Sequence, residues 1–117
     1  MKKLYNISLL IFLLLFSYKS QSQEEIYSKL NEIAFIDQKV MMPMRDGVRL
    51  ATDIYRPRTN NKVPIIFSRT PYNFNSWGDG EEKTRAYYAA YEAVKRGYAY
   101  VIQNERGRYF SEGEWDI

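Results

Sequence analysis

The chain has 117 residues, which is enough for one modest domain and too few for two. Its 45% hydrophobic and 26% charged residues are an ordinary balance for a globular protein and exclude a disordered chain. The net charge of +3 comes from basic residues scattered along the sequence, which argues against nucleic-acid binding, and the absence of cysteine excludes disulfides and thiolate metal sites.

The N-terminus has the pattern of a secretory signal peptide. Lys2 and Lys3 give a positive start, and the apolar stretch Ile7–Phe16 is too short to span a bilayer comfortably. Ser20-Gln21-Ser22 then places small residues at the spacing that a signal peptidase requires. We therefore expect residues 1–22 to be cleaved, which predicts a secreted or periplasmic protein that does not stay in the membrane. The alternative is an uncleaved membrane anchor.

The next stretch, residues 23–31, is polar apart from Ile26, Tyr27 and Leu30. These three residues recur at helical spacing, which predicts a short amphipathic lead-in helix.

An antiparallel hairpin is predicted next. Residues 35–44 form its first strand, Arg45-Asp46-Gly47 provides a turn that tolerates positive φ, and residues 48–55 form the second strand. Polar and apolar residues alternate in the second strand, which predicts one packed face and one wetter face. Pro43 demotes the first strand to a sheet edge or a bulge.

A strand, a helix and a second strand follow. Residues 63–67 are apolar without alternation, which predicts a strand of a parallel sheet that is covered on both faces. Residues 82–96 form a helix with acidic residues at its start, basic residues at its end and Gly97 as its C-terminal cap. Residues 98–103 form the last strand. The helix should pack through one stripe, formed by Ala86, Tyr87, Ala90, Tyr91, Ala93 and Val94.

This order of elements, an antiparallel hairpin followed by a parallel strand-helix-strand unit, is how the α/β-hydrolase fold begins. In that fold the loop between the third strand and the first helix supplies one donor to the oxyanion hole. Tyr72 lies in this loop, and its neutral phenol offers one O–H to a developing oxyanion. Pro71 fixes φ directly before it and biases Thr70 toward extended geometry. The plainer alternative is a turn tyrosine whose ring covers the sheet edge.

The rest of a hydrolytic site is missing from this sequence. It contains no histidine, so it provides neither a Ser-His-Asp nor a Cys-His site. No Gly-x-Ser-x-Gly elbow occurs, and Ser111 lacks that frame. We therefore expect a truncated chain, with residues 23–117 forming the N-terminal fragment of a catalytic domain. Alone it should be inactive, because the nucleophile, the acid and the histidine would lie beyond Ile117.

Two charged clusters are more simply explained as solvated loop charge than as binding sites. Arg106-Gly107-Arg108 lacks the glycine-rich helix start of a phosphate site. The carboxylates of residues 79–82 and 112–114 have no histidine or matching acidic partner for metal or acid-base chemistry. We expect no cofactor and no metal.

Three segments resemble a family of serine esterases and peptidases, the CocE/NonD-like family of the cocaine esterases, the α-amino-acid ester hydrolases and the Xaa-Pro dipeptidyl-peptidases. They are Val40–Leu50, with Pro-Met-Arg-Asp-Gly; Arg69–Asn73, with Thr-Pro-Tyr; and Gly97–Glu114, with Arg-Gly-Arg-Tyr-Phe-Ser-Glu-Gly. The last of these runs is closest to the α-amino-acid ester hydrolases. Together the segments span most of residues 36–115.

The resemblance implies that Tyr72 gives its hydroxyl to the oxyanion hole, beside the backbone N–H that follows the nucleophilic serine. It also reveals one departure: Asn104 stands where the family usually has aspartate. A neutral amide there would weaken an ion pair with Arg106 and puts the usual bracing of that loop in doubt.

The expected function is therefore a secreted serine hydrolase that cleaves ester or amide bonds of amino-acid-like acyl groups through an acyl-enzyme. Its partners would be small-molecule esters or short peptides, with a homo-oligomer of the full-length protein left open. Xaa-Pro dipeptidyl-peptidase activity is the alternative within the class. A small, exported, non-catalytic binding module with a tyrosine-rich face is the alternative from another class.

Overall fold

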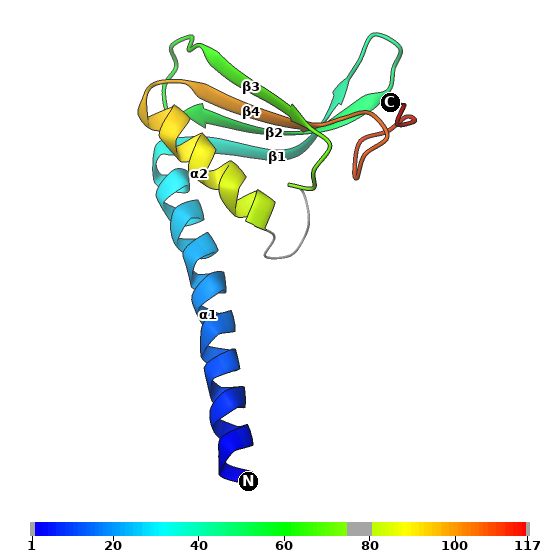
Figure 1. Ribbon diagram of the computed structural model, residues 1–117. Coiled ribbons are helices and arrows are strands. Elements are labelled where there is room, and N and C mark those ends of the chain that lie inside the picture. Colours follow the sequence, from blue (N-terminus) through cyan, green and yellow to red (C-terminus); the bar gives the residue numbers. More distant parts are fainter. Residues whose placement is uncertain (1, 75–80, 117) are drawn as a thin grey trace.

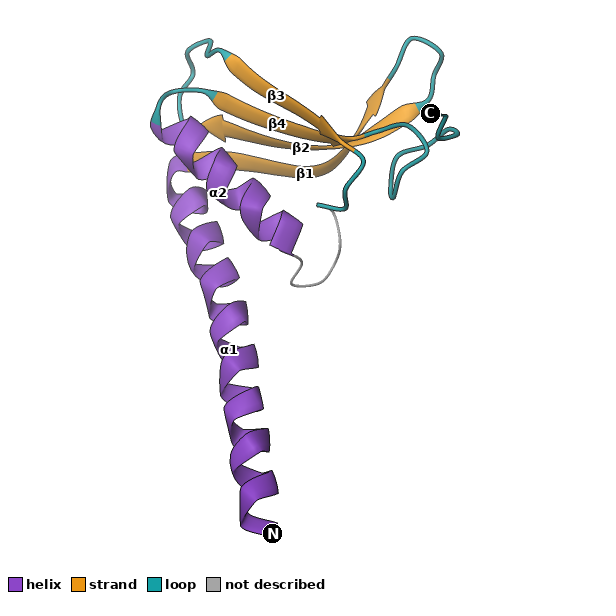
Figure 2. Cartoon of the chain, viewed as in Figure 1, coloured by secondary structure: helices purple, strands orange, loops and turns teal. Residues whose placement is uncertain are grey.

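The computed structural model describes residues 2–74 and 81–116, which form two helices and one four-stranded sheet. In chain order the elements are α1 (Lys2–Ile33), β1 (Ala34–Pro43), β2 (Arg49–Pro57), β3 (Ile65–Thr70), α2 (Glu81–Lys95) and β4 (Ala99–Asn104). Both helices lie on the same side of the sheet, and the first part of α1 extends away from it (Figure 1). Figure 2 shows that the hairpin between β1 and β2 curls away from the helices.

The sheet confirms the predicted α/β class. Its strand order is β1-β2-β4-β3, with antiparallel β1/β2 and β2/β4 pairs and a parallel β3/β4 pair. Gly47 closes the hairpin with a φ of 85°, and its N–H donates to the carbonyl of Met44 at 3.0 Å. An antiparallel hairpin thus leads into a parallel strand-helix-strand unit, as expected of the start of an α/β-hydrolase.

β1 lies at one edge of the sheet, as Pro43 predicted, but its bulge lies away from the proline. The pairing with β2 shifts between Asp37 and Val40, and Lys39 in this interval has a φ of 54°. The Lys39 N–H donates to the carboxylate of the buried Asp53 at 2.8 Å. Burial raises the pKa of Asp53, and this hydrogen bond opposes the rise. The bulge therefore places a backbone donor against a desolvated carboxylate.

β2 corrects the prediction of one packed and one wetter face, because residues 50–53 are buried throughout. The strand lies between β1 and β4, and the helices cover one of its faces. On the other face, Gln103 Nε2 donates to Thr52 Oγ1 at 2.9 Å, and Arg69 Nη2 donates to Gln103 Oε1 at 2.8 Å. Long polar side chains from β3 and β4 therefore cover the face of Thr52, while Tyr55, from the alternate set of residues, is buried in the hydrophobic core.

β3 also differs from the prediction of a strand covered on both faces. Ile65, Ile66 and Phe67 are 64%, 42% and 50% exposed. β3 lies at the edge of the sheet and, within the described residues, pairs only with β4. An apolar run without alternation shows that both faces of a strand are suited to packing. It does not show whether other elements cover those faces.

α2 confirms the predicted helix and its cap. Gly97 has a φ of 86°, its N–H donates to Val94 O at 3.0 Å, and the N–H of Tyr98 donates to Ala93 O at 3.0 Å. Tyr91 in the predicted stripe is half-buried. The other stripe residues are buried against the sheet: Ala86, Tyr87, Ala90, Ala93 and Val94.

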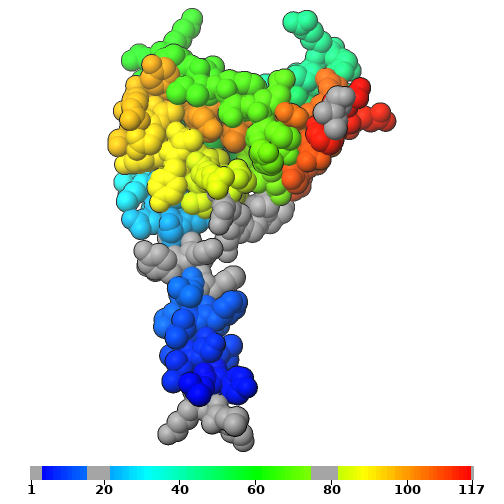
Figure 3. Space-filling view, viewed as in Figure 1, coloured from blue at the N-terminus to red at the C-terminus, as the bar shows by residue number. Residues whose placement is uncertain are grey.

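α1 extends the predicted lead-in helix in both directions and divides into two environments. Ile26 and Leu30 are 3% and 0% exposed and belong to the hydrophobic core. Residues 4–15 are all exposed and stand apart from the globular body (Figure 3). Across the described helices, none combines the length and the apolarity needed to cross a membrane. Cleavage of residues 1–22 stays a prediction.

Candidate active site

Tyr72 lies in the loop that leaves the carboxyl end of β3. β3 and β4 are parallel, with Thr70 in register with Asn104, so the carboxyl ends of both strands meet at this loop. Ligands of open α/β sheets bind at such strand ends. The Tyr72 side chain is 64% exposed, whereas Phe74, two positions later, is 2% exposed and belongs to the core. Phe74 therefore anchors the loop while Tyr72 faces solvent.

Hydrogen bonds from the end of β4 and the residues that follow it hold this loop. The carbonyl of Thr70 accepts from the backbone N–H of Glu105 at 3.1 Å and from Asn104 Nδ2 at 3.2 Å. The carbonyl of Tyr72 accepts from the same Nδ2 at 2.8 Å. Arg108 Nε donates to the carbonyl of Pro71 at 3.4 Å. Three successive carbonyl oxygens are thus satisfied from one segment, which fixes the backbone beneath the phenol.

The Tyr72 backbone is further fixed by its own N–H, which donates to Thr70 Oγ1 at 3.1 Å. Its hydroxyl, in contrast, has no hydrogen-bond partner within residues 2–74 and 81–116. A fixed backbone with an uncommitted O–H is the arrangement that a preorganised donor requires. The oxyanion role of Tyr72 stays a prediction.

A pocket of about 210 Å³ adjoins Tyr72 between the sheet and α2. Tyr100 is half-buried in its wall, and burial raises the pKa of this phenol against an opposing hydrogen bond from Ser68. The phenol therefore remains protonated at neutral pH. The full lining is Ser68, Thr70, Tyr72, Phe74, Glu82, Arg85, Ala86, Ala89, Tyr100 and Ile102.

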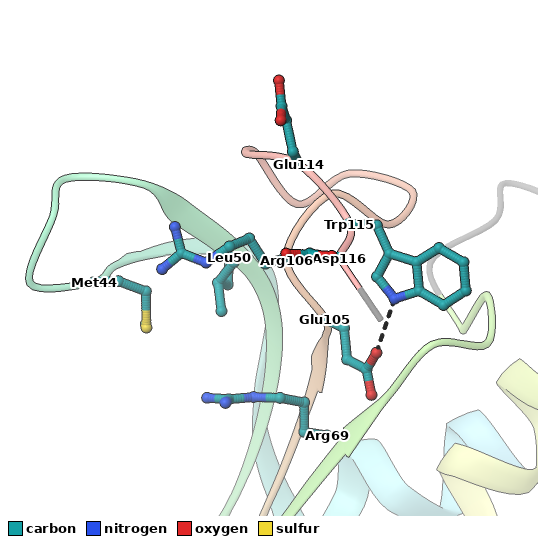
Figure 4. Close-up of a pocket in the computed structure, with 8 residues that line it drawn as sticks. All are labelled: Met44, Leu50, Arg69, Glu105, Arg106, Glu114, Trp115 and Asp116. Atoms are coloured by element: carbon teal, nitrogen blue, oxygen red, sulfur yellow. Dashed lines mark hydrogen bonds between the residues drawn. The ribbon is translucent and has the colours of Figure 1, made fainter.

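A larger pocket of about 320 Å³ lies elsewhere, between the hairpin and the C-terminal loop, and Tyr72 does not line it (Figure 4). Its lining is Met44, Leu50, Arg69, Glu105, Arg106, Glu114, Trp115 and Asp116. Glu105 accepts a hydrogen bond from the Trp115 indole at 3.3 Å, and Arg69 is bound to Gln103. Because these charged side chains already bind protein groups, the larger pocket is a weaker site candidate than the one beside Tyr72.

The Arg106-Gly107-Arg108 run binds protein groups. Arg106 pairs with Asp46 of the hairpin turn at 2.7 Å, and the guanidinium holds the pKa of Asp46 below its usual range. Arg108 lies 4.2 Å above the Trp115 ring, in addition to its bond to Pro71. The run therefore ties the C-terminal loop to the hairpin and to the Tyr72 loop.

The carboxylate clusters do not form a metal site in the part of the chain that the structure describes. Glu112 pairs with Arg49, whose hydrogen bond lowers the pKa of the carboxyl, and Glu82 pairs with Arg85 at 2.8 Å. Glu114 is exposed. Asp79 lies outside the described residues.

Ser111 is 8% exposed and holds two strands together. Its Oγ accepts from the N–H of Ala51 at 3.0 Å and donates to the carbonyl of Asn104 at 3.0 Å. A hydroxyl with both functions used inside the sheet is a structural group, which agrees with its lack of a nucleophile frame.

Asn104 is the residue whose role the sequence did not reveal. The resemblance suggested that residue 104 interacts with Arg106, but Arg106 binds Asp46 instead. Asn104 is 0% exposed, and its amide donates to the two carbonyls that flank Pro71. The signal for this role was a polar side chain at the end of a buried parallel strand, which needs a partner nearby.

Comparisons with known proteins agree with the resemblance. The family model "X-Pro dipeptidyl-peptidase (S15 family)" matches residues 46–117. Cocaine esterase from Rhodococcus sp. (strain MB1 Bresler) is 44% identical over 81 residues, which cover 68% of this chain and 13% of the esterase. The solved structure of an alpha-amino acid ester hydrolase matches with a TM-score of 0.54 and 34% identity, over 71% of this chain and 14% of that one.

A CocE/NonD family hydrolase from Staphylococcus aureus matches with a TM-score of 0.51 and 18% identity, over 65% of this chain and 16% of that one. This similarity supports the fold alone. Across these three relatives, the chain spans 13% to 16% of their length. The family match contains β2, the Tyr72 loop and the strand-helix-strand unit.

Proposed function

Because the chain belongs to the X-Pro dipeptidyl-peptidase (S15) family, we propose that it is the N-terminal part of a serine hydrolase that cleaves ester or amide bonds of amino-acid-like acyl groups. The observation that carries the proposal is the loop of Tyr72, whose backbone is fixed while its hydroxyl has no partner in the described structure. The nucleophilic serine, the acid and the histidine are supplied by sequence that follows residue 117.

In this mechanism the serine attacks the acyl carbon while the histidine takes its proton, and negative charge develops on the former carbonyl oxygen. The Tyr72 hydroxyl donates a hydrogen bond to that oxygen, together with the backbone N–H that follows the serine. The histidine gives this proton to the leaving alcohol or amine, which departs, and water then attacks the acyl-enzyme with the same base assistance. Tyr72 thus stabilises the tetrahedral intermediates of both acylation and deacylation.

Esters of α-amino acids are the favoured substrates. The solved alpha-amino acid ester hydrolase shares 34% identity with this chain, and the cocaine esterase shares 44% over its matched region. The alternative is cleavage after an Xaa-Pro dipeptide, which the name of the matching family suggests. Both reactions need the same oxyanion donor, so Tyr72 supports either.

Activity measurements on the full-length protein test this proposal directly. We expect it to hydrolyse p-nitrophenyl esters of α-amino acids much faster than Xaa-Pro p-nitroanilides, and a fluorophosphonate probe should label one serine outside residues 1–117. Preference for the Xaa-Pro anilide would move the assignment to the peptidase alternative. A soluble protein that neither turns over substrate nor reacts with the probe would favour a binding module.

We also propose that the protein is exported and that its mature N-terminus is Gln23. Residues 4–15 expose a largely apolar helical surface, with Leu4 at 73% and Phe12 at 67%, which a signal peptidase would remove. In a secreting bacterial host, mass spectrometry of the exported protein should give a chain that begins at Gln23. Recovery from the membrane with residues 1–22 intact would show an uncleaved anchor instead.

A further inference from the structure

The carboxamide of Asn104 is the side chain that makes two hydrogen bonds to the backbone on either side of Pro71. Its Nδ2 lies 3.2 Å from the carbonyl oxygen of Thr70 and 2.8 Å from that of Tyr72. We propose that Asn104 is a positioning residue for Tyr72, which sets the direction of the phenol by fixing the peptide units around it. This inference rests on the oxyanion role proposed for Tyr72.

The position of Asn104 suits this role. It is the last residue of β4, it is 0% exposed, and it is in register with Thr70 of the parallel neighbour β3. The backbone carbonyl of Asn104 accepts a hydrogen bond from the hydroxyl of the buried Ser111. That hydroxyl in turn accepts a hydrogen bond from the N–H of Ala51 in β2. A continuous set of hydrogen bonds therefore runs from the interior of the sheet to the Tyr72 loop.

The chemistry of the contacts requires a donor. The Nδ2 atom meets two carbonyl oxygens, so the group at this position must supply N–H or O–H. An amide nitrogen carries two hydrogens, one for each carbonyl. Leucine, which is close in size, has no polar hydrogen and would leave both carbonyls without this donor. Pro71 has no N–H, so this loop lacks one of the backbone donors that could otherwise stabilise it.

The direction of the Tyr72 phenol depends on this contact, because its ring is largely exposed. The ring is 64% exposed, and the described residues offer its hydroxyl no partner. Its direction is therefore set by the backbone of residues 70–72. A displacement of a reacting or stabilising group by about 1 Å can cost on the order of 10²-fold in rate.

The test is a kinetic double-mutant cycle in the full-length enzyme, with active sites counted by burst titration. We expect Asn104→Leu to lower kcat per active site about 10- to 100-fold with little change in KM, because the loss falls on the transition state. In a Tyr72→Phe background the same change should lower kcat less than about twofold, since the group that Asn104 positions is already gone.

Asn104→Ala provides a second variant if the leucine protein does not fold, because it removes the amide without adding bulk. It should also lower kcat per active site with little change in KM. Thr52→Val is the matched control. It removes buried hydrogen bonds to Leu50 and Gln103 in the same sheet, neither of which binds the Tyr72 loop, so it should lower the melting temperature and leave kcat per active site unchanged.

The outcomes separate the two proposals. If Tyr72→Phe alone leaves kcat unchanged, the oxyanion role fails and the positioning role fails with it. If Tyr72→Phe is strongly impaired but Asn104→Leu and Asn104→Ala keep full kcat, only the positioning role is overturned. Equal losses from Asn104→Leu in both backgrounds would likewise overturn it, because they would show a structural effect that does not act through the phenol.

Discussion

Tyr72→Phe in the full-length protein is expected to lower kcat by about 10²–10³, the usual cost of removing one donor from an oxyanion hole. The change deletes a single oxygen and keeps the ring. The backbone bonds of Tyr72 to Asn104 and Thr70 do not involve that oxygen and should persist. The loss therefore falls on the hydrogen bond that strengthens as charge develops on the substrate.

The same geometry predicts that folding is unaffected. The hydroxyl has no partner within the described residues, so its removal leaves no buried group unsatisfied. The melting temperature should match that of wild type within about 1 °C, which corresponds to a surface change of less than about 0.5 kcal/mol. Tyr88→Phe is a matched control, because Tyr88 is also exposed, at 49%, but lies on α2 away from the loop.

Steady-state kinetics and single-turnover acylation distinguish the possible results. Acylation and deacylation should both slow in Tyr72→Phe, because both pass through a tetrahedral oxyanion. Full turnover in a correctly folded Tyr72→Phe protein would remove the phenol from the mechanism and leave the backbone N–H groups as the oxyanion donors. The larger pocket between the hairpin and the C-terminal loop would then need examination as the substrate site.

The sequence predicted those parts of the fold that depend on local backbone preferences. Gly47 and Gly97 both adopt the positive φ that their turn and cap require, with values of 85° and 86°. The alanine and tyrosine stripe of α2 is buried because its spacing matches the helical period. In these cases residues a few positions apart contain the information, so a single sequence is sufficient.

The sequence failed where distant residues decide the outcome. The alternation in β2 did not reveal that Arg69 and Gln103 cover its second face, because those residues come from β3 and β4. The apolar run of β3 did not reveal that this strand lies at an edge. Burial of a strand depends on its neighbours in the sheet, and the strand's own residues do not specify them.

The two main residues of the candidate site also differ in whether the sequence predicts them. Tyr72 could be predicted, because its loop follows a strand and precedes a helix and because the Thr-Pro-Tyr segment carries the resemblance. Asn104 could not, since its partners lie 34 and 32 positions away in the sequence. The sequence suggested that its neutral amide weakens an ion pair with Arg106, but Arg106 pairs with Asp46. Only the register of β3 and β4 brings Asn104 under the loop.

Leu30→Ala is expected to destabilise the sheet core by about 2–5 kcal/mol, because Leu30 is fully buried in the hydrophobic core and its truncation leaves a cavity. Residues 23–33 should thus remain part of the domain after the signal segment is removed. Native-state hydrogen exchange at the amides of β2 and β4 measures the loss within a larger protein. Glu32→Ala, on the exposed side of the same helix, should change exchange by less than about 0.5 kcal/mol. Unchanged protection in Leu30→Ala would mean that the helix detaches from the mature domain.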